Sequence, residues 1–270
     1  MKNRILTAST LALTAAASTA SAANISYTGG TYSQNFDGLA NSPFGTTQTQ
    51  SGRGPHALGT GLGGSTGVDG WFGGNFSGSS ANTEFRVQDG SLGSGGGRGV
   101  ISFGAVGSSE RAVGLLSTSN QISSVGAVLS NDTAGTLTSV TVSYFGEQWR
   151  RGNVATPNSI NFFYGLNATI QTAATAFSAL SFTGPNTQAA PTEVALNGNA
   201  AANRTFISAT ITGLNWTPGS TLALVWRAID QDGQDDGLAI DDVSISAVPA
   251  PAALPLAGLG ALAIVRRRRA

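Results

Sequence analysis

The sequence predicts an all-β protein built as an antiparallel, jelly-roll-like β-sandwich. Apolar residues recur at every second position in several short segments, clusters of Gly, Asn, Asp and Pro separate those segments, and no long segment carries a capped apolar stripe at helical spacing. Alternation with a period of two places one face of a strand on a core. Many such strands divided by turns favour two sheets that bury their inner faces against each other.

Five segments are expected to be strands, the first of them near residues 83–88. The other four show clear apolar alternation, at Val140, Val142 and Tyr144, at Ile160, Phe162 and Tyr164, at Ile207, Ala209 and Ile211, and at Leu222, Leu224 and Trp226. The stretches SNDTAG, TGPNTQ and TPGS supply turns between strands. Residues 45–99 are glycine-rich, so we expect long loops there around the strand near 83–88.

The first 22 residues have the three parts of a secretory signal peptide. Lys2 and Arg4 form the positive end, an apolar run follows from Ile5 to Ala17, and Ala20-Ser21-Ala22 is a small-residue cleavage site. An N-terminal membrane anchor is the alternative, but the apolar run is well short of the ~20 residues that span a bilayer. We therefore expect residues 1–22 to be removed by cleavage after export through the Sec machinery.

The chain closes with a second targeting pattern, in which an apolar run over residues 252–265 is followed by four arginines. Arginines directly after an apolar run hold that end on the cytoplasmic side of a membrane. The order of a proline motif, an apolar helix, an arginine cluster and the chain end resembles the PEP-CTERM sorting signal, which exosortases recognise in Gram-negative bacteria. The residues that carry this resemblance are Val248, Pro249, Pro251, Arg266, Arg267, Arg268 and Arg269.

The namesake glutamate of that signal is replaced here, and Val248-Pro249-Ala250-Pro251-Ala252 looks like its VP-x-PA subtype. The resemblance implies that residues 248–270 insert transiently into the inner membrane as a short hydrophobic sorting helix. It also implies a cut near residues 249–251, after which the body is released or attached to the cell surface or the exopolysaccharide matrix. A simple tail anchor is the alternative.

Removing both ends leaves residues 23–247, which suit one β-sandwich domain with a sizeable core. Eight arginines, no lysine and all fourteen acidic residues give this body a formal charge of −6. Such a body lacks the clustered cations that nucleic-acid phosphates require. Cysteine is absent, which excludes disulfides, zinc–thiolate sites and cysteine nucleophiles.

Six of the fourteen acidic residues gather in the segment WRAIDQDGQDDGLAIDDV, residues 226–243. Calcium binds several carboxylate and carbonyl oxygens on a flexible loop, so this segment is a candidate calcium site, although its spacing departs from an EF-hand. The candidate ligands are Asp230, Asp232, Asp235, Asp236 and Asp241. The alternative is an acidic hairpin turn followed by an edge strand, with Asp241 and Asp242 bonded to backbone N–H groups or to an arginine.

A second polar group follows directly on a predicted strand and offers a candidate glycan site. It consists of Glu147, Gln148, Trp149 and Arg150, and the separate segment SSERAVG supplies Glu110 and Arg111 elsewhere in the chain. An aromatic face covers the C–H surface of a sugar while planar polar groups hold its hydroxyls. The alternative is that the carboxylates and arginines form partly buried pairs that pin loops to the sandwich, with Trp149 in the core or at its rim.

The segments NFDGL, GSSERAVG, YFGEQWRRG, ALNGNAAANR and DGLAIDDVSIS together resemble a lectin-like or carbohydrate-binding-module-like jelly-roll domain. The resemblance implies architecture and no catalytic residues. We expect a non-enzymatic exported protein that an exosortase sorts to the cell surface or exopolysaccharide matrix. The alternatives are a lectin-like module, with calcium as its one candidate cofactor, and a polysaccharide-active enzyme that uses Glu110 and Glu147. The sole histidine, His56, lies in a glycine-rich stretch that is unsuited to a catalytic triad.

Overall fold

The computed structural model describes residues 23–249 except 154 and 188–191, and these residues form two packed β-sheets. The first sheet has the order β12 (Thr175–Ala176), β11 (Ser159–Leu166), β16 (Thr221–Ala228), β9 (Ile122–Asn131), β5 (Trp71–Ser77) and β4 (His56–Ala57), with β1 (Ile25–Tyr27) paired to β9 and β13 (Phe182–Thr183) paired to β11. The β-sandwich predicted from the alternation is confirmed.

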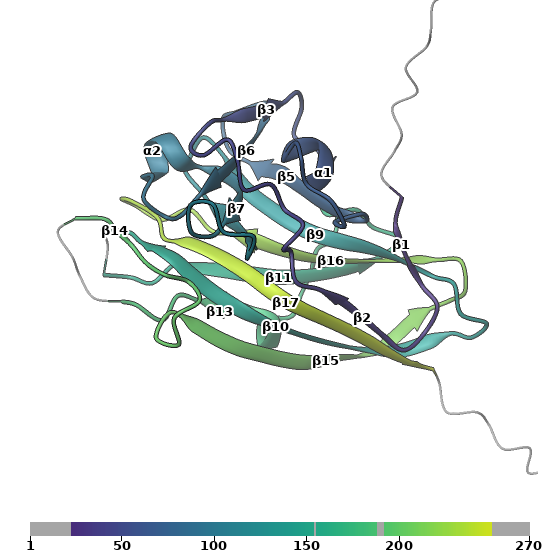
Figure 1. Ribbon diagram of the computed structural model, residues 1–270. Coiled ribbons are helices and arrows are strands. Elements are labelled where there is room, and N and C mark those ends of the chain that lie inside the picture. The colour runs from purple at the N-terminus through teal and green to yellow at the C-terminus, as the bar shows by residue number, and fades with distance from the viewer. Residues whose placement is uncertain (1–22, 154, 188–191, 250–270) are drawn as a thin grey trace, which may run out of the picture.

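The second sheet is the longer of the two in its central strands. Its order is β14 (Val194–Ala195), β10 (Leu137–Arg151), β17 (Gly237–Pro249), β8 (Ala112–Leu116), β7 (Gly99–Phe103), β6 (Thr83–Gln88) and β3 (Gln48–Gln50), with β15 (Arg204–Trp216) paired to β10 and β2 (Thr31–Gln34) paired to β17. Figure 1 shows β15, β10 and β17 side by side along the length of the molecule. The single-turn helices are α1 (Leu58–Gly61), α2 (Ser94–Gly97) and the 3₁₀ turn η1 (Ser178–Leu180).

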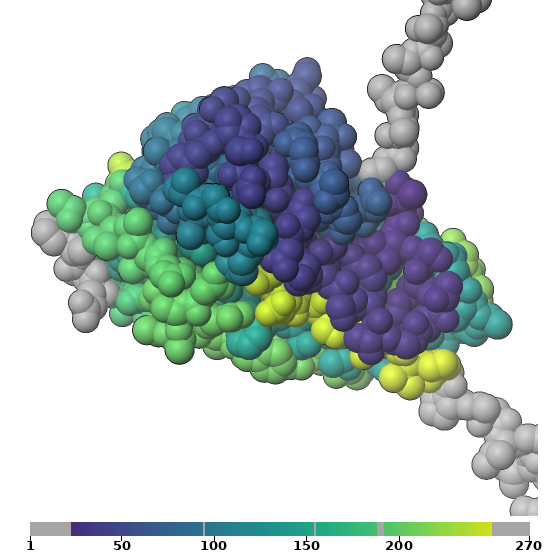
Figure 2. Space-filling view, viewed as in Figure 1, coloured from purple at the N-terminus to yellow at the C-terminus, as the bar shows by residue number. Residues whose placement is uncertain are grey.

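Strand pairing is antiparallel throughout the described residues except at two places, where β1 runs parallel to β9 and β6 runs parallel to β7. The β6–β7 pair is joined by a short glycine-rich connection that contains α2. On the face shown in Figure 2, the N-terminal segment in purple lies beside the yellow strand β17, as the pairing of β2 with β17 requires.

The core lies between the sheets and centres on Trp226 of β16. Its indole packs against Trp71 at a centroid distance of 5.9 Å, against Tyr144 at 5.4 Å and against Phe162 at 5.1 Å. These residues come from both sheets, so alternation in β16, β11 and β10 places their apolar side chains in one cluster.

The prediction that residues 45–99 form long loops around one strand was wrong in part. The strand near 83–88 is β6, but the same region also holds β3, β4 and β5, and Trp71 of β5 has an exposed fraction of 0%. Glycine within β5 has a packing reason, since a Cβ at Gly73 would lie 2.8 Å from the ring of Phe85. The neighbouring sheet therefore imposes the strand that the composition disfavours.

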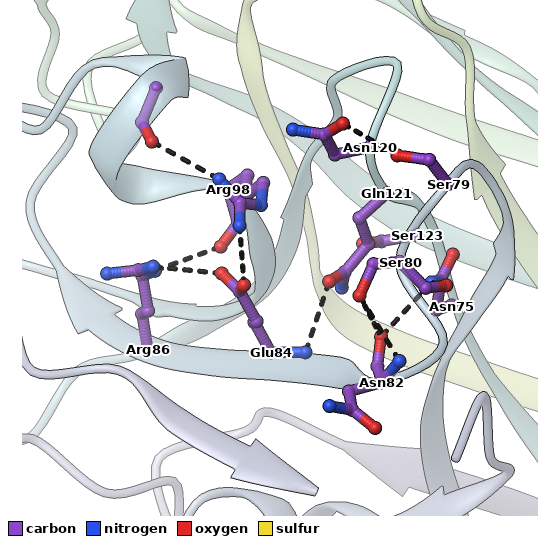
Figure 3. A network of polar contacts seen from close by, with 11 residues as sticks. Asn75, Ser79, Ser80, Asn82, Glu84, Arg86, Arg98, Asn120, Gln121 and Ser123 are labelled. Atoms are coloured by element: carbon purple, nitrogen blue, oxygen red, sulfur yellow. Dashed lines mark hydrogen bonds and ion pairs between the residues drawn. The ribbon is translucent and has the colours of Figure 1, made fainter. Parts of the chain in front are cut away.

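A polar network ties this glycine-rich region to the rest of the sandwich (Figure 3). Glu84 accepts hydrogen bonds from Arg86 Nη2 at 2.9 Å and from Arg98 Nη2 at 2.6 Å. The backbone N–H of Glu84 donates to Gln121 Oε1 at 3.2 Å, in the turn before β9. Glu84 thus fixes the connection to β7 through its carboxylate and the approach to the first sheet through its backbone N–H.

Candidate functional site

The four residues predicted to bind a glycan lie at the end of β10 and are buried. The exposed fraction is 0% for Glu147 and Gln148, 2% for Trp149 and 1% for Arg150. The face of Trp149 is therefore not presented to solvent as a sugar platform. Its indole stacks on Phe103 with a centroid distance of 6.0 Å and an angle of 7°, and its Nε1 donates to Glu147 Oε2 at 2.9 Å.

The other two residues hold loops in place. Gln148 Nε2 donates to Asp236 Oδ2 at 3.0 Å, and Gln148 Oε1 accepts from the Asn186 backbone N–H at 2.8 Å. Arg150 donates from Nη1 to the Gly90 carbonyl at 2.9 Å and forms an ion pair with Glu193 through Nη2. The contacts follow the alternative interpretation, in which these side chains are buried partners of loops.

A hollow of about 600 Å³, which we call the loop pocket, opens directly beside Trp149. Three loops surround it: the β6–β7 loop, the β7–β8 loop, and the segment that follows β14. In Figure 2 the green chain after β14 lies against the teal chain of the β7–β8 loop. The side chains that define the pocket are Asp89, Val106, Glu110, Trp149, Asn197 and Asn199.

Asn199 and Glu110 join two of these loops, because Asn199 Nδ2 donates a hydrogen bond to Glu110 Oε2. The backbone N–H of Asn199 donates to Asn197 Oδ1 at 3.1 Å, which fixes the turn between them. Gly198 lies directly on the indole edge, where a Cβ would approach Trp149 Nε1 to 2.2 Å. Only glycine at this position lets the loop close over Trp149 and form one wall of the pocket.

Two buried carboxylates lie near the loop pocket without lining it. Burial raises the pKa of Glu147 to about 7, although the Trp149 hydrogen bond and Arg204 favour its ionised form. Burial also raises the pKa of Asp241 to about 8, and the neighbouring charge of Glu147 raises it further. Arg204 Nη2 lies 3.5 Å from Glu147 Oε1 and 3.6 Å from Asp242 Oδ2, so one cation pairs with two carboxylates.

The acidic segment does not bring its predicted calcium ligands together. Asp230 and Asp232 are exposed, whereas Asp235 and Asp236 are buried, and Asp241 lies further along β17 beside Glu147. Within residues 23–249, apart from the gaps at 154 and 188–191, no group of three or more His, Asp or Glu side chains is placed to hold a metal ion. The five carboxylates do not form one cluster in the described residues, and calcium binding by this segment stays a prediction.

Asp235 and Asp236 have protein partners instead. Asp235 Oδ1 accepts from Asn158 Nδ2 at 2.7 Å, while Asp236 Oδ1 accepts from the Gly152 N–H at 2.6 Å and lies 3.6 Å from Arg151 Nη1. The strand that follows is also not an edge strand, because β17 pairs with β10 on one side and with β8 and β2 on the other. The acidic turn thus joins β16 to a central strand of the second sheet.

The predicted targeting ends fall almost wholly outside the described residues. The signal peptide at 1–22, Pro251, and Arg266 to Arg269 lie there, whereas Val248 and Pro249 are the last two residues of β17. Among the described residues, no helix has the length and apolar character needed to cross a membrane.

The residues of the loop pocket that sequence reasoning missed include Asp89, Asn197 and Asn199. Each lies in a short polar stretch of a kind that also forms ordinary turns, so the sequence alone does not distinguish them. Their contact with Glu110 and Trp149 depends on strand order, which brings the β7–β8 loop next to β14.

Comparisons with known proteins assign no family: no family model matches the chain, and no curated protein matches its sequence. Among solved structures, the chain is similar to the K2 cleaved adhesin domain of Lys-gingipain, with a TM-score of 0.37 and 13% identity, over 80% of this chain and 99% of that one. It is similar to the K3 cleaved adhesin domain of Lys-gingipain from Porphyromonas gingivalis, with a TM-score of 0.35 and 14% identity, over 53% and 78%.

The chain is also similar to the xylan-binding module CBM15, with a TM-score of 0.35 and 15% identity, over 68% of this chain and 94% of that one. Likeness at this level does not transfer a ligand or an activity. The β-sandwich assignment rests on the two sheets themselves.

Proposed function

We propose that the protein is a non-enzymatic, exported glycan-binding protein whose loop pocket holds a neutral sugar. The observation that carries the proposal is the convergence of Asp89, Glu110, Asn197 and Asn199 on one hollow beside Trp149. A sugar hydroxyl donates one hydrogen bond and accepts others, and carboxylates and amides together offer both functions. The volume of about 600 Å³ falls within the ~300–1,000 Å³ typical of small-molecule sites.

The charge of the pocket favours a neutral ligand. Asp89 and Glu110 both line it, and among the described residues no arginine does. An anionic sugar would bring a further negative charge next to these carboxylates, which costs binding free energy. The expected ligand is therefore an uncharged hexose or pentose unit of a polysaccharide.

The carboxylate pair considered for catalysis, Glu110 and Glu147, does not meet in the loop pocket. A glycosidase needs two carboxyl groups that face the scissile bond across a cleft. Glu110 lines the loop pocket together with Asp89, whereas Glu147 is fully buried behind Trp149 and does not line it. We assign Asp89 and Glu110 to the binding of sugar hydroxyls. If the protein is a binder, prolonged incubation leaves the chain length of a bound polysaccharide unchanged, and any shortening contradicts the proposal.

The binding proposal is tested by screening the purified protein against neutral oligosaccharides and then titrating the best one calorimetrically. We expect Glu110→Gln and Asn199→Ala each to weaken binding at least about tenfold, because each leaves polar groups of the ligand unpaired. Asn120→Ala is the matched control, since Asn120 is exposed in a turn that does not line the pocket. Absence of any neutral ligand, or equal affinity in all three variants, overturns the proposal.

The two ends of the chain support a proposal about destination. We infer export through a cleaved signal peptide and sorting by an exosortase to the cell surface or exopolysaccharide matrix, as the tail resemblance implies. Mass spectrometry of the mature protein should find a new N-terminus after Ala22 and a C-terminus near residues 249–251. Retention of residues 252–270 in the mature protein would favour the simple tail anchor.

A further inference from the structure

A second hollow lies on the outer face of the first sheet, remote in its lining residues from the loop pocket. It measures about 290 Å³, and we call it the sheet-face pocket. The residues that line it include Phe76 of β5, Asn161 and Phe163 of β11, Arg227 of β16, and Asp230. None of these residues contributes to the loop pocket.

Strand alternation puts Arg227 into this pocket. Trp226 points into the core, so the next residue points to the opposite face of the sheet. Arg227 is in register with Asn161 on one neighbouring strand and with Ser124 on the other. It is therefore fixed in the middle of three hydrogen-bonded strands.

The guanidinium of Arg227 is held between two aromatic rings. Its central carbon lies 3.5 Å from the ring centroid of Phe76 and 4.4 Å from that of Phe163. Nη2 donates to the Ala173 carbonyl at 3.2 Å and to the Ile170 carbonyl at 3.4 Å. These contacts fix the plane of the guanidinium, so its remaining donors have a defined direction.

Arg227 has no carboxylate partner among the described residues. Its exposed fraction is 8%, its Nε is buried without a hydrogen-bond partner, and no acidic side chain in the described part of the chain lies within ion-pair distance of it. Asp230 at the rim interacts with Asp235 instead. Burial lowers the pKa of Arg227 only to about 10, so the group stays charged at neutral pH.

A buried charge without a counter-ion is costly unless something supplies one. A planar carboxylate matches the guanidinium in geometry and charge, and the aromatic rings beside it suit the C–H face of a sugar ring. The volume of about 290 Å³ lies just below the ~300–1,000 Å³ range typical of ligand sites, which suits a single sugar ring. Phe76 has an exposed fraction of 39%, so its ring remains available to such a ligand.

We propose that the sheet-face pocket binds the carboxylate of a hexuronate unit in an acidic polysaccharide, with Arg227 as the anion contact and Phe76 and Asn161 beside it. This site goes beyond the proposed function, because it recognises an acidic sugar where the loop pocket recognises a neutral one. Its existence does not depend on the loop pocket.

The test uses oligogalacturonate and its methyl ester, which keeps the sugar shape and removes the charge. We expect calorimetry to find binding of the acid and at least about tenfold weaker binding of the ester. Arg227→Lys should weaken binding of the acid by about tenfold, since lysine lacks the planar fork. Phe76→Ala should weaken it several-fold with little change in melting temperature, because the ring is partly exposed.

The control is Arg53→Lys, an exposed arginine that bonds the Gly78 carbonyl, which should bind the acid unchanged. The neutral oligosaccharide is titrated in parallel against each variant, so failure of one site is distinguishable from failure of the other. Equal affinity for acid and ester, undiminished binding by both Arg227→Lys and Phe76→Ala, or equal competition by inorganic sulfate overturns the proposal of a sugar carboxylate site.

Discussion

The loop pocket and the sheet-face pocket differ in how they are built and in the charged side chains that line them. Three loops form the loop pocket, and its ionisable side chains are Asp89 and Glu110. Regular strands form most of the sheet-face pocket, which is lined by the buried Arg227 and the exposed Asp230. The comparison teaches that one sandwich can offer two kinds of ligand site. Loops bring several polar side chains together, whereas alternation along a strand places single side chains, such as Arg227, on the outer face of a sheet.

The largest expected effect is the loss of stability when Trp226 is replaced, compared with replacement of its neighbour Arg227. Trp226→Ala removes the central indole of the core and should lower the free energy of unfolding by about 3–5 kcal/mol. Arg227→Met should change stability far less, because an apolar side chain of similar length replaces an unpaired buried charge. Chemical denaturation measures both, and a larger loss in Arg227→Met than in Trp226→Ala would mean that the arginine is a structural element.

The next largest effect on stability is expected in the acidic turn between β16 and β17. Asp236→Ala removes the acceptor of the Gly152 N–H and of Gln148 Nε2, both of which are buried. Each buried donor left without a partner costs about 1–3 kcal/mol, so the variant should lose more stability than Asp232→Ala, whose carboxylate is exposed. Equal melting temperatures for the two variants would contradict the assignment of Asp236 as a loop anchor.

A pH titration compares the buried carboxylates with the rest of the molecule. Glu147, with a pKa raised from 4.5 to about 7, and Asp241, with a pKa raised from 3.8 to about 8, bind more protons in the folded than in the unfolded state between those values. Their stabilisation is fully present below the unfolded pKa values and is lost as the pH rises through the folded ones.

The melting temperature should therefore fall between about pH 4 and pH 8, by roughly 2–4 °C for each kcal/mol lost. Asp241→Asn should flatten this profile, since the amide does not titrate. Thermal unfolding followed by circular dichroism at a series of pH values measures the slope. A melting temperature that rises over this range would contradict the assigned protonation states.

The smallest effect is expected from calcium. Since Asp235 and Asp236 already accept N–H donors and Asp241 lies apart, calcium should leave the melting temperature unchanged relative to chelator. If calcium raises the melting temperature, and the rise disappears when Asp230, Asp232, Asp235 and Asp236 are changed to Asn, the predicted calcium site is supported.

Much of the fold was predictable because the alternating segments carry their own pattern. The strands β10, β11, β15 and β16 follow from alternating apolar residues, and β6 lies where the sequence placed it. The strand β5 was missed because Gly73 and Gly74 interrupt its apolar pattern. Gly73 has a packing reason, since Phe85 and Val100 of the second sheet leave no room for a Cβ there. The central position of β17 also depends on long-range pairing that no local pattern specifies.

The sites were less predictable than the fold. The polar residues around Trp149 were predicted to form a site, and a pocket lies beside them. Glu147 and Arg150 are buried and support loops, however, while Asn197 and Asn199 line the pocket. Arg227 was not among the predicted site residues, because a single arginine after an alternating apolar run is common in sequences. Its significance comes from the two rings beside it and the carboxylate it lacks, and both are properties of three dimensions.

The strand β17 reaches Val248 and Pro249, the residues that open the predicted sorting motif, while still paired with Ser139 and Leu137 of β10. A protein held through that motif would transmit any pull directly along this strand. Because β17 has partners on both sides, tension would load many interstrand hydrogen bonds in shear at once instead of opening them one after another. Attachment at this end would therefore place mechanical load on a strand well suited to resist it.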